Sequence, residues 1–419
     1  MKSWPYKCFA VSKYDFESAK PAMDTNSRSP PPYRPRTAAS LLSGYLRGYP
    51  VVVVTGPRQA GKSTLLAHEL PTWRQVSLED PDTRAQARED PRGFLARHGQ
   101  PLVIDEAQHA PELFSYLQTA VDRRATTGQY VLSGSQNLAL VARVSQSLAG
   151  RAALVELLPF SVSELDRSWL DEASLSRALW AGCFPAVHVR SLQPASYYAN
   201  YTATYVERDV RQITQVHDLL QFQRFVRLCA GRIGQLLNLS ALAADAGISQ
   251  PTASAWLSVL EAGYLVRRLA PYHVNFGKRL VKAPKLYFVD TGLAAWLLGI
   301  QSADVLEAHP LRGALFENWV VMEAVKYRVH RGDMRPLYFW RDNIGTEVDL
   351  VLEEGASLTG VEIKSGQTLA SDMVRHLHAW QRHTATGAPR RAALVYGGDD
   401  AFERWGVQVV GWRELSRIG

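Results

Sequence analysis

Short runs of consecutive apolar residues alternate with segments of helical periodicity in the first part of the chain. The runs lie at 51–54, 74–78, 102–104, 130–132 and 152–158. Strands that are apolar without interruption are buried on both faces, which is typical of a parallel sheet covered by helices. We therefore predict an α/β domain with a parallel sheet over residues 38–165.

The pattern changes twice after this domain. From about residue 166 to 300 the apolar positions recur with helical spacing, which predicts a helical region. Beyond residue 301 a helix is followed by apolar strands at 337–340, 347–352 and 360–363, a helix from about 372 and a strand at 392–396, which predicts a second α/β unit over 301–419. Residues 1–37 are rich in Pro, Ser and Arg without periodicity, and we predict a disordered tail there.

The first apolar run leads directly into a glycine-containing loop. Residues 51–66 read VVVVTGPRQAGKSTLL, which satisfies GxxxxGK[ST] after a strand and before a helix. Backbone N–H groups of such a loop point at phosphate oxygens, and the helix N-terminus adds a positive dipole. Lys62 is expected to bridge β- and γ-phosphates, and Ser63 to bind Mg²⁺. The residues expected to surround the phosphates are Gly56, Pro57, Arg58, Gln59, Ala60, Gly61, Lys62, Ser63 and Thr64.

A second apolar strand, at 101–104, ends in two acids. Asp105 is predicted to hold Mg²⁺ through water, and Glu106 to polarise the attacking water. An apolar strand that ends in acids is often only a solvated strand terminus, but its position after a phosphate-binding loop favours the functional interpretation. Two adjacent acids also favour hydrolysis over simple nucleotide switching.

These two motifs, with the strand YVLSGS at 130–135, resemble the core of an AAA-type ATPase, a P-loop NTPase. The resemblance implies that the strand between the two motif strands ends in a sensor of the γ-phosphate, and Ser133 and Ser135 both qualify. Arg151 and the following segment LLPFS at 157–161 resemble the boundary of the same family's domain. Arg151 is a candidate arginine sensor or finger, in cis or from a neighbouring subunit. The alternative is a surface arginine that begins a strand.

Residues 239–260, LSALAADAGISQPTASAWLSVL, have the pattern of a helix–turn–helix within a winged helix at about 222–272. Ser240 is expected to cap the first helix, Gly247 to turn the chain and Ser249 to cap the second helix. The exposed face of the second helix is predicted to carry only uncharged polar residues, which favours a structural or protein-contact role over the reading of DNA bases. Those residues are Gln250, Thr252, Ser254 and Ser258. The basic residues that follow, expected to contact phosphates or to be solvated, are Arg267, Arg268, Lys278, Arg279, Lys282 and Lys285.

Four charged residues of the C-terminal unit lie on successive predicted elements, in the order Glu317, Asp349, Glu362 and Lys364. Because side chains alternate along a strand, Glu362 and Lys364 share one face, where Asp349 of a neighbouring strand can meet them. Two carboxylates can bind a divalent cation, and a lysine can position water. This order resembles the PD-(D/E)xK nuclease (restriction-endonuclease-like) fold, with Glu317 as the accessory helix acid, although Val348 stands where that family has Pro. The alternative is a strand with a charged outer face.

The net charge of +7 changes this picture little, because residues 1–48 alone contribute +5, from eight basic and three acidic residues. Lysine usage is more informative. Only ten of the 47 basic residues are lysines, and two of them, Lys62 and Lys364, stand where the motifs require an ammonium group. No apolar stretch approaches the roughly 18 residues of a membrane-spanning helix, and three widely spaced cysteines favour neither disulfides nor zinc. We expect a cytoplasmic protein without membrane contact.

The three segments together resemble prokaryotic AAA-type ATPases that end in a domain of unknown function. The resemblance implies ATP and Mg²⁺ as cofactors. It leaves three hypotheses: an ATPase whose nucleotide state controls a nucleic-acid-related C-terminal domain, an ATP-regulated metal-dependent DNA nuclease, or a nucleotide-dependent switch that binds DNA or protein without cutting. A homo-oligomer or a protein partner is plausible in each case.

Overall fold

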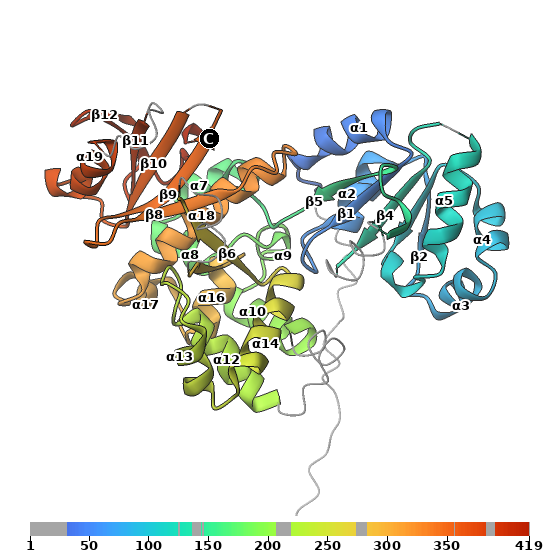
Figure 1. Cartoon of the computed structure of the whole chain (residues 1–419), viewed down its shortest axis with the longest axis horizontal. Helices are drawn as coiled ribbons and strands as arrows, with labels where there is room; N and C mark the ends of the chain where they lie inside the picture. Colours follow the sequence, from blue (N-terminus) through green and yellow to red (C-terminus); the bar gives the residue numbers. More distant parts are fainter. Residues whose placement is uncertain are drawn as a thin grey trace, which may run out of the picture. The chain divides into compact units, whose positions relative to one another are not determined.

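The computed structural model describes residues 32–124, 126–135, 144, 146–206, 219–273, 283–355, 357–382 and 390–418. The predicted N-terminal α/β domain is present and is built on a five-stranded parallel sheet (Figure 1). Its strands are β1 (Val51–Thr55), β2 (Arg74–Ser77), β3 (Leu102–Asp105), β4 (Tyr130–Gly134) and β5 (Ala152–Glu156). Their order is β2-β3-β4-β1-β5. As the AAA resemblance implies, β4 lies between the two motif strands β1 and β3.

Helices cover both faces of this sheet, and β1 shows why its sequence is apolar throughout. Val52 and Val54 share a core with residues of α1 and α2, whereas Val51 and Val53 share another core with residues of α4 and α5. Since side chains alternate along a strand, both sets are buried only if both faces are covered. The helical elements of the domain are α1 (Ala38–Gly48), α2 (Lys62–Glu69), α3 (Pro81–Glu89), α4 (Pro91–His98), η1 (Ala107–His109) and α5 (Leu113–Arg124).

The end of the predicted tail is packed rather than solvated. Arg36 is only 5% exposed and donates hydrogen bonds to the carbonyl oxygens of Ala60 (2.8 Å) and Leu158 (2.6 Å). Its guanidinium also lies 3.2 Å from the buried carboxylate of Glu164. Composition favoured solvated chain up to residue 37, but Arg36 has a buried acid as its partner. The folded part therefore begins before α1.

The region after the ATPase-like domain is largely helical, as predicted. Its core includes Phe222 and Phe225, whose rings meet the ring of Trp256 edge-on at 5.3 and 5.5 Å. Its helical elements are η2 (Val162–Glu164), α7 (Arg167–Glu172), α8 (Leu175–Ala181), α9 (Pro185–Val189), α10 (Pro194–Tyr201), η3 (Thr202–Val206), α12 (Leu219–Ala230), α13 (Leu239–Ala246), α14 (Gln250–Ala262), α16 (Thr291–Leu297) and α17 (Ala303–Glu307).

Helices α13 and α14 occupy the positions expected of the helix–turn–helix. Gly247, with a φ of +74°, ends α13, and Ser249 caps α14 by accepting a hydrogen bond from Thr252 N at 3.2 Å. The predicted cap at Ser240 is wrong. The side chain of Asn238 accepts from Ala241 N instead, at 3.0 Å, because the helix begins two residues earlier than a cap at Ser240 requires.

The second sheet has eight strands in the order β12-β13-β11-β10-β9-β8-β6-β7. Its strands are β6 (Val266–Pro271), β7 (Lys285–Phe288), β8 (Leu337–Arg341), β9 (Glu347–Glu354), β10 (Ser357–Lys364), β11 (Arg390–Tyr396), β12 (Phe402–Arg404) and β13 (Val407–Gly411). The remaining helical elements are α18 (Arg312–Val329), η4 (Ser371–Val374), α19 (Arg375–Arg382) and η5 (Leu415–Arg417). The hairpin of β6 and β7 joins this sheet through parallel pairing of β6 with β8. A boundary at residue 301 therefore divides strands that share one sheet, which local sequence patterns do not reveal.

Candidate nucleotide site and C-terminal acidic cluster

The phosphate-binding loop connects β1 to α2, as the motif predicts. Gly56 has a φ of +147°, and a Cβ atom at this position would lie 2.0 Å from the carbonyl oxygen of Leu157, so no other residue fits there. Lys62 opens α2 and is 6% exposed. Its ammonium donates hydrogen bonds to the carbonyl oxygens of Gly56 (3.0 Å) and Pro57 (2.9 Å). The ammonium thus lies over the loop that is expected to surround the phosphates.

The carboxylate of Asp105 joins three elements of the ATPase-like domain. Ser63 Oγ, in the first turn of α2, donates a hydrogen bond to Asp105 Oδ2 at 2.8 Å. Ser133 Oγ, on β4, donates to the other oxygen, Oδ1. A hydroxyl and a carboxylate are oxygen ligands of the kind Mg²⁺ prefers. The residues predicted to bind Mg²⁺ are therefore together and chemically suited to it.

Glu106 lies beside this pair in a strained backbone conformation, with a φ of +51°. Its Oε2 accepts hydrogen bonds from Ser135 Oγ, at 3.2 Å, and from the side-chain amide of Gln108. Ser133 and Ser135 each contact one of the two acids, so the choice of γ-phosphate sensor stays open. Sequence reasoning missed Gln108, although its position two residues after the acid was available as a signal.

Arg151 is not brought to the phosphate-binding loop. It precedes β5, whereas the loop follows β1, and the two strands are parallel. The five residues of β5 span roughly 16 Å, so Arg151 lies at the opposite edge of the sheet. Its guanidinium instead binds the carboxylate of Asp122 at 2.6 and 2.9 Å. The structure therefore contradicts a role for Arg151 in cis, because strand direction places it away from the nucleotide.

A buried polar network, also missed by the sequence, lies between the loop and α18. Besides contacting Ala60 of the loop, Arg36 faces Glu164. Burial raises the pKa of Glu164, but the charge of Arg36 and two backbone N–H donors oppose it, and the pKa is lowered overall. Leu158 N donates to His330 Nε2 at 3.1 Å, and burial lowers the pKa of His330 to about 3.

One turn earlier on α18, Lys326 and Glu323 bind the same segment of chain. The Lys326 ammonium donates to the carbonyl oxygen of Phe160 and to Glu323, both at 2.8 Å. Glu323 also accepts from Val162 N at 2.7 Å. One face of α18 therefore holds residues 158–162, which directly follow the last strand of the ATPase-like sheet.

The four charged residues predicted in the C-terminal unit do come together. Lys364 Nζ lies 2.6 Å from Glu362 Oε1 on the shared face of β10. Asp349 Oδ2 accepts from Ile363 N at 2.8 Å. Glu317 reaches the group from α18, since its Oε1 and Asp349 Oδ1 lie 2.9 and 4.0 Å from the same ammonium, that of Lys285. Glu362 and Lys364 thus share a face of β10, as alternation along the strand predicts.

A fifth residue, Lys285 of β7, lies among these acids and was misjudged from the sequence. Its ammonium is 2.9 Å from Glu317 Oε1, 2.5 Å from Glu347 Oε1 and 4.0 Å from Asp349 Oδ1. The residue is only 2% exposed. Lys285 is therefore neither a solvated charge nor a phosphate contact, because its ammonium is buried against carboxylates. Lys278, Arg279 and Lys282, which shared this prediction, lie outside the described residues.

The arginines of β6 are likewise paired with acids. Arg267 binds Glu156, and Arg268 lies 2.7 Å from Glu261. In the acidic cluster, burial and the charges of Glu317 and Glu362 raise the pKa of Asp349 well above its ordinary range. Within the described ranges no group of three or more His, Cys, Asp or Glu side chains is arranged to hold a metal ion. The residues predicted for the second metal site nevertheless lie together in one cluster.

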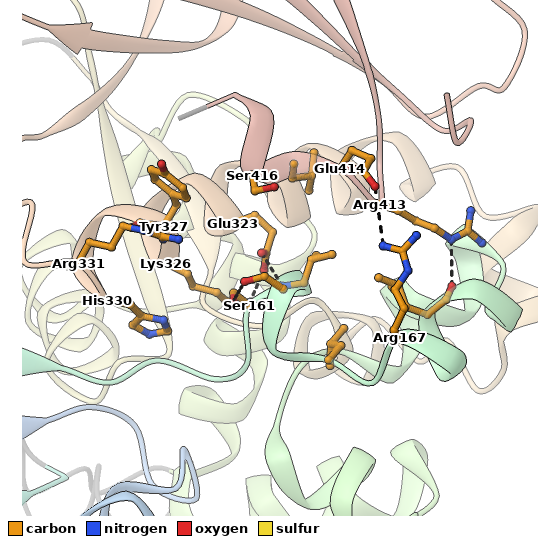
Figure 2. A pocket seen from close by; sticks show the side chains of 15 residues that line it. Ser161, Arg167, Glu323, Lys326, Tyr327, His330, Arg331, Arg413, Glu414 and Ser416 are labelled. Atoms are coloured by element: carbon orange, nitrogen blue, oxygen red, sulfur yellow. Dashed lines mark hydrogen bonds and ion pairs between the residues drawn. The ribbon is translucent and has the colours of Figure 1, made fainter. Parts of the chain in front are cut away.

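A polar cavity of about 290 Å³ lies against α18 (Figure 2). Ser161, Glu323 and Lys326 line one part of it, and Arg167 and Arg413 another. Arg413 donates to two backbone carbonyl oxygens, and Arg167 pairs with nearby acids. The charged groups that line this cavity are already bound to protein atoms, and they hold neighbouring segments together.

Comparisons with known proteins agree with the geometry of the nucleotide site. Residues 48–166 match the AAA domain family. Residues 172–304 and 312–415 match two domains of unknown function, DUF8612 and DUF4143. Residues 48–166 are therefore an AAA-type P-loop ATPase domain, a class of ATP-binding domain. In the part of the chain described here, no helix is both long and apolar enough to cross a membrane.

Two solved structures share only weak similarity with the chain. The Walker-type ATPase PABY2304 of Pyrococcus abyssi is similar over 64% of this chain and 99% of that one, at 15% identity and a TM-score of 0.43. AMPPCP-bound DnaA from Aquifex aeolicus is similar over 54% of this chain and 85% of that one, at 12% identity and a TM-score of 0.25.

Two curated relatives are much more similar in sequence. Uncharacterized protein Rv2008c of Mycobacterium tuberculosis and Uncharacterized protein Mb2031c of Mycobacterium bovis are each 35% identical over 372 residues. Each match covers 88% of this chain and 81% of the relative. The chain therefore belongs to the family of these uncharacterised mycobacterial proteins.

Proposed function

We propose that this protein is a Mg²⁺-dependent ATPase whose nucleotide state controls its C-terminal half. The observation that carries the proposal is the joining of Ser63, Asp105 and Ser133 by hydrogen bonds beside the phosphate-binding loop. The AAA match over residues 48–166 supports ATP as the nucleotide.

In this proposal each residue of the site has one task. Backbone N–H groups of the loop from Gly56 to Gly61 and the ammonium of Lys62 bind the phosphates. Ser63 and Asp105 hold Mg²⁺, which when bound offsets the negative charge of the phosphates. Glu106 orients and polarises the attacking water, and Ser133 or Ser135 senses the γ-phosphate.

The contacts of α18 support control of the C-terminal half. Glu323, Lys326 and His330 bind residues 158–162, and Glu317 of the same helix belongs to the acidic cluster. A helix is a stiff connection, so a change in the segment after β5 is expected to move Glu317 as well. This gives nucleotide state a physical route to the C-terminal sheet.

Substitution of Lys62 tests the proposal. In Lys62→Ala we expect ATP binding to weaken about a hundredfold, the effect of losing a charge-assisted contact of roughly 3 kcal/mol, and hydrolysis to be lost. Calorimetric titration with ATP·Mg²⁺ and a phosphate-release assay measure both. Lys364→Ala is the matched control, because it also removes one lysine but leaves the loop intact. Unchanged ATP turnover in Lys62→Ala would refute the assignment.

We interpret α13, α14 and the β6–β7 hairpin as a winged helix, and the sheet from β8 to β13 with α18 as a PD-(D/E)xK-like unit. For the winged helix we propose a structural or protein-contact role, since Gln250, Ser254 and Ser258 are exposed and uncharged. Because Arg151 lies away from the nucleotide site of its own chain, it could act as an arginine finger only toward the nucleotide of a neighbouring subunit. Sedimentation with and without ATP tests such assembly.

Between the two alternative functions, the geometry favours the switch that does not cut DNA. The carboxylates of the acidic cluster bind an internal ammonium, and no three of the described acids, histidines or cysteines are placed for a metal. Purified protein with Mn²⁺ is therefore expected to retain DNA in a salt-dependent manner and to leave it uncut. Nicking that is lost in Glu362→Ala or Lys364→Ala would favour the regulated nuclease.

A further inference from the structure

Lys285 lies where the acidic cluster would otherwise need a cation from solution. Its ammonium contacts Glu317 and Glu347 at 2.9 and 2.5 Å and lies 4.0 Å from Asp349. The three acids come from α18 and β9, and the lysine comes from β7. Carboxylates that converge on one centre from different elements repel one another unless a positive charge lies between them.

The other donors around the cluster are also used. Tyr287 O–H donates to Glu317 Oε1 at 2.6 Å, and Ile363 N donates to Asp349 Oδ2 at 2.8 Å. Arg341 lies 3.4 Å from Glu347 Oε2, and Lys364 lies 2.6 Å from Glu362 Oε1. Four carboxylates thus face three cationic side chains.

A divalent ion would have to displace these donors. Mg²⁺ takes six oxygen ligands at about 2.0–2.1 Å in octahedral geometry. Oε2 of Glu362 is buried without a hydrogen-bond partner, so it is the atom that an added ion would satisfy. Oε1 of Glu317 and Oδ2 of Asp349 accept hydrogen bonds, and Oδ1 of Asp349 faces the ammonium of Lys285.

We propose that the ammonium of Lys285 takes the place of a divalent metal ion in the acidic cluster, so that this centre is held together without a metal. The strand β7 belongs to the hairpin that precedes α18, so the ion pairs also fasten this hairpin to β9 and α18. This inference concerns the C-terminal cluster alone and does not depend on ATP hydrolysis.

Counting bound Mn²⁺ by electron paramagnetic resonance, on the nucleotide-free full-length chain, tests the proposal. We expect the wild type and Glu362→Gln to bind the same number of Mn²⁺ ions, because the wild-type cluster holds none. Removal of the ammonium in Lys285→Met is expected to create a Mn²⁺ site, because the freed carboxylates become ligands. At this cluster the variant should bind Mn²⁺ at least about tenfold more tightly than the wild type does. The double variant Lys285→Met/Glu362→Gln is expected to lose this gain.

Lys326→Met is the matched control. Lys326 is equally buried at 2% exposure and also pairs with a carboxylate, Glu323, but it lies outside the acidic cluster. It is expected to gain no Mn²⁺ site. A wild-type Mn²⁺ site that depends on Glu362 would overturn the proposal, whether or not Lys285→Met folds. So would a folded Lys285→Met that gains no Mn²⁺. Neither result bears on ATP binding, which is measured separately with Lys62→Ala.

Discussion

Two buried lysines show how differently the two halves of this chain use an ammonium group. Lys62 lies against its own loop and donates to the carbonyl oxygens of Gly56 and Pro57. Lys285 lies against carboxylates, with Glu317 and Glu347 within 3 Å. The first donates to carbonyl oxygens, which a phosphate can replace with charge-assisted bonds, whereas the second is surrounded by carboxylates.

The difference separates a ligand site from a structural centre. A triphosphate offers Lys62 stronger acceptors than the carbonyl groups, so binding has a favourable exchange to drive it. For Lys285 any exchange would leave buried carboxylates without their counter-charge, which is strongly unfavourable. We therefore expect chemistry at the first lysine and stability at the second, and the following predictions test that division in order of decreasing effect.

The largest effect is expected for Glu106→Gln. The variant keeps the size of the side chain and its contact with Ser135, but it loses the charge that polarises water. We expect ATP hydrolysis to fall by about 10²- to 10⁴-fold with ATP binding retained, the usual range for loss of a general base. Single-turnover phosphate release, beside calorimetric ATP titration, measures the two separately. A fall in binding as large as the fall in rate would contradict the assigned role.

Substitution of Arg36 tests how much the buried ion pair beside the phosphate-binding loop contributes to the stability of the protein. Arg36→Met removes the partner of the Glu164 carboxylate, which is more deeply buried than the acids around Lys285, so we expect the protein to lose about 3–5 kcal/mol of stability. Chemical denaturation followed by circular dichroism measures the loss.

Arg34→Met supplies the control for Arg36. Its ion pair with Asp166, at 2.9 Å, is partly exposed, and its loss is expected to change stability by at most about 1 kcal/mol. Equal losses of stability in the two variants would show that burial of Glu164 does not increase the contribution of its ion pair.

The contrast between these arginines also shows what the sequence could predict. The loop from Gly56 to Thr64 and the acids Asp105 and Glu106 follow from local spacing, because one strand–loop–helix and one strand end determine them. Arg36 looks like part of a Pro- and Arg-rich tail, since its partner Glu164 lies 128 residues away in the chain. Local patterns contain no information about such a pairing.

The scarcity of lysine in this chain indicates functional or structural positions. The scarcity of lysine drew attention to Lys62 and Lys364, while Lys285 was grouped with nearby arginines. All four lysines within the described ranges, Lys62, Lys285, Lys326 and Lys364, turn out to bind carbonyl or carboxylate groups in the interior or at its edge. That Glu362 and Lys364 share a face of β10 was predictable from alternation along the strand, but the pairing of β6 with β8 that brings β7 into the same sheet was not.

A moderate effect is expected for Tyr287→Phe in the acidic cluster. The change removes one O–H donor, at 2.6 Å from Glu317, and leaves the ring in place. A hydrogen bond to a charged group contributes about 1.5–3 kcal/mol, so we expect a stability loss of that size with ATP hydrolysis unaffected. Denaturation and ATPase assays on the same preparation check both. A large change in hydrolysis without a change in stability would contradict a purely structural cluster.

The last effect concerns His330, the residue that follows the C-terminal end of α18. Burial lowers its pKa to about 3, and Leu158 N donates to its Nε2, so the folded protein holds the ring neutral. An unfolded histidine has a pKa of about 6.5. As the pH falls below about 6.5, the unfolded state binds a proton that the folded state excludes, so stability present above that pH is progressively lost toward pH 3.

This one group is expected to remove about 2 kcal/mol of stability between pH 7.5 and 5. His330→Gln retains an acceptor for Leu158 N but cannot titrate, so its stability should depend on pH less steeply by that amount. Burial also lowers the pKa of His188, which acts in the same direction in both proteins and cancels in the comparison. Denaturation midpoints across this range give the two slopes. Parallel slopes for the wild type and His330→Gln would mean that the folded protein also takes up a proton at His330. A protonated ring cannot accept the hydrogen bond from Leu158 N. The contact after β5 through which we expect the two halves to be coupled would then be broken.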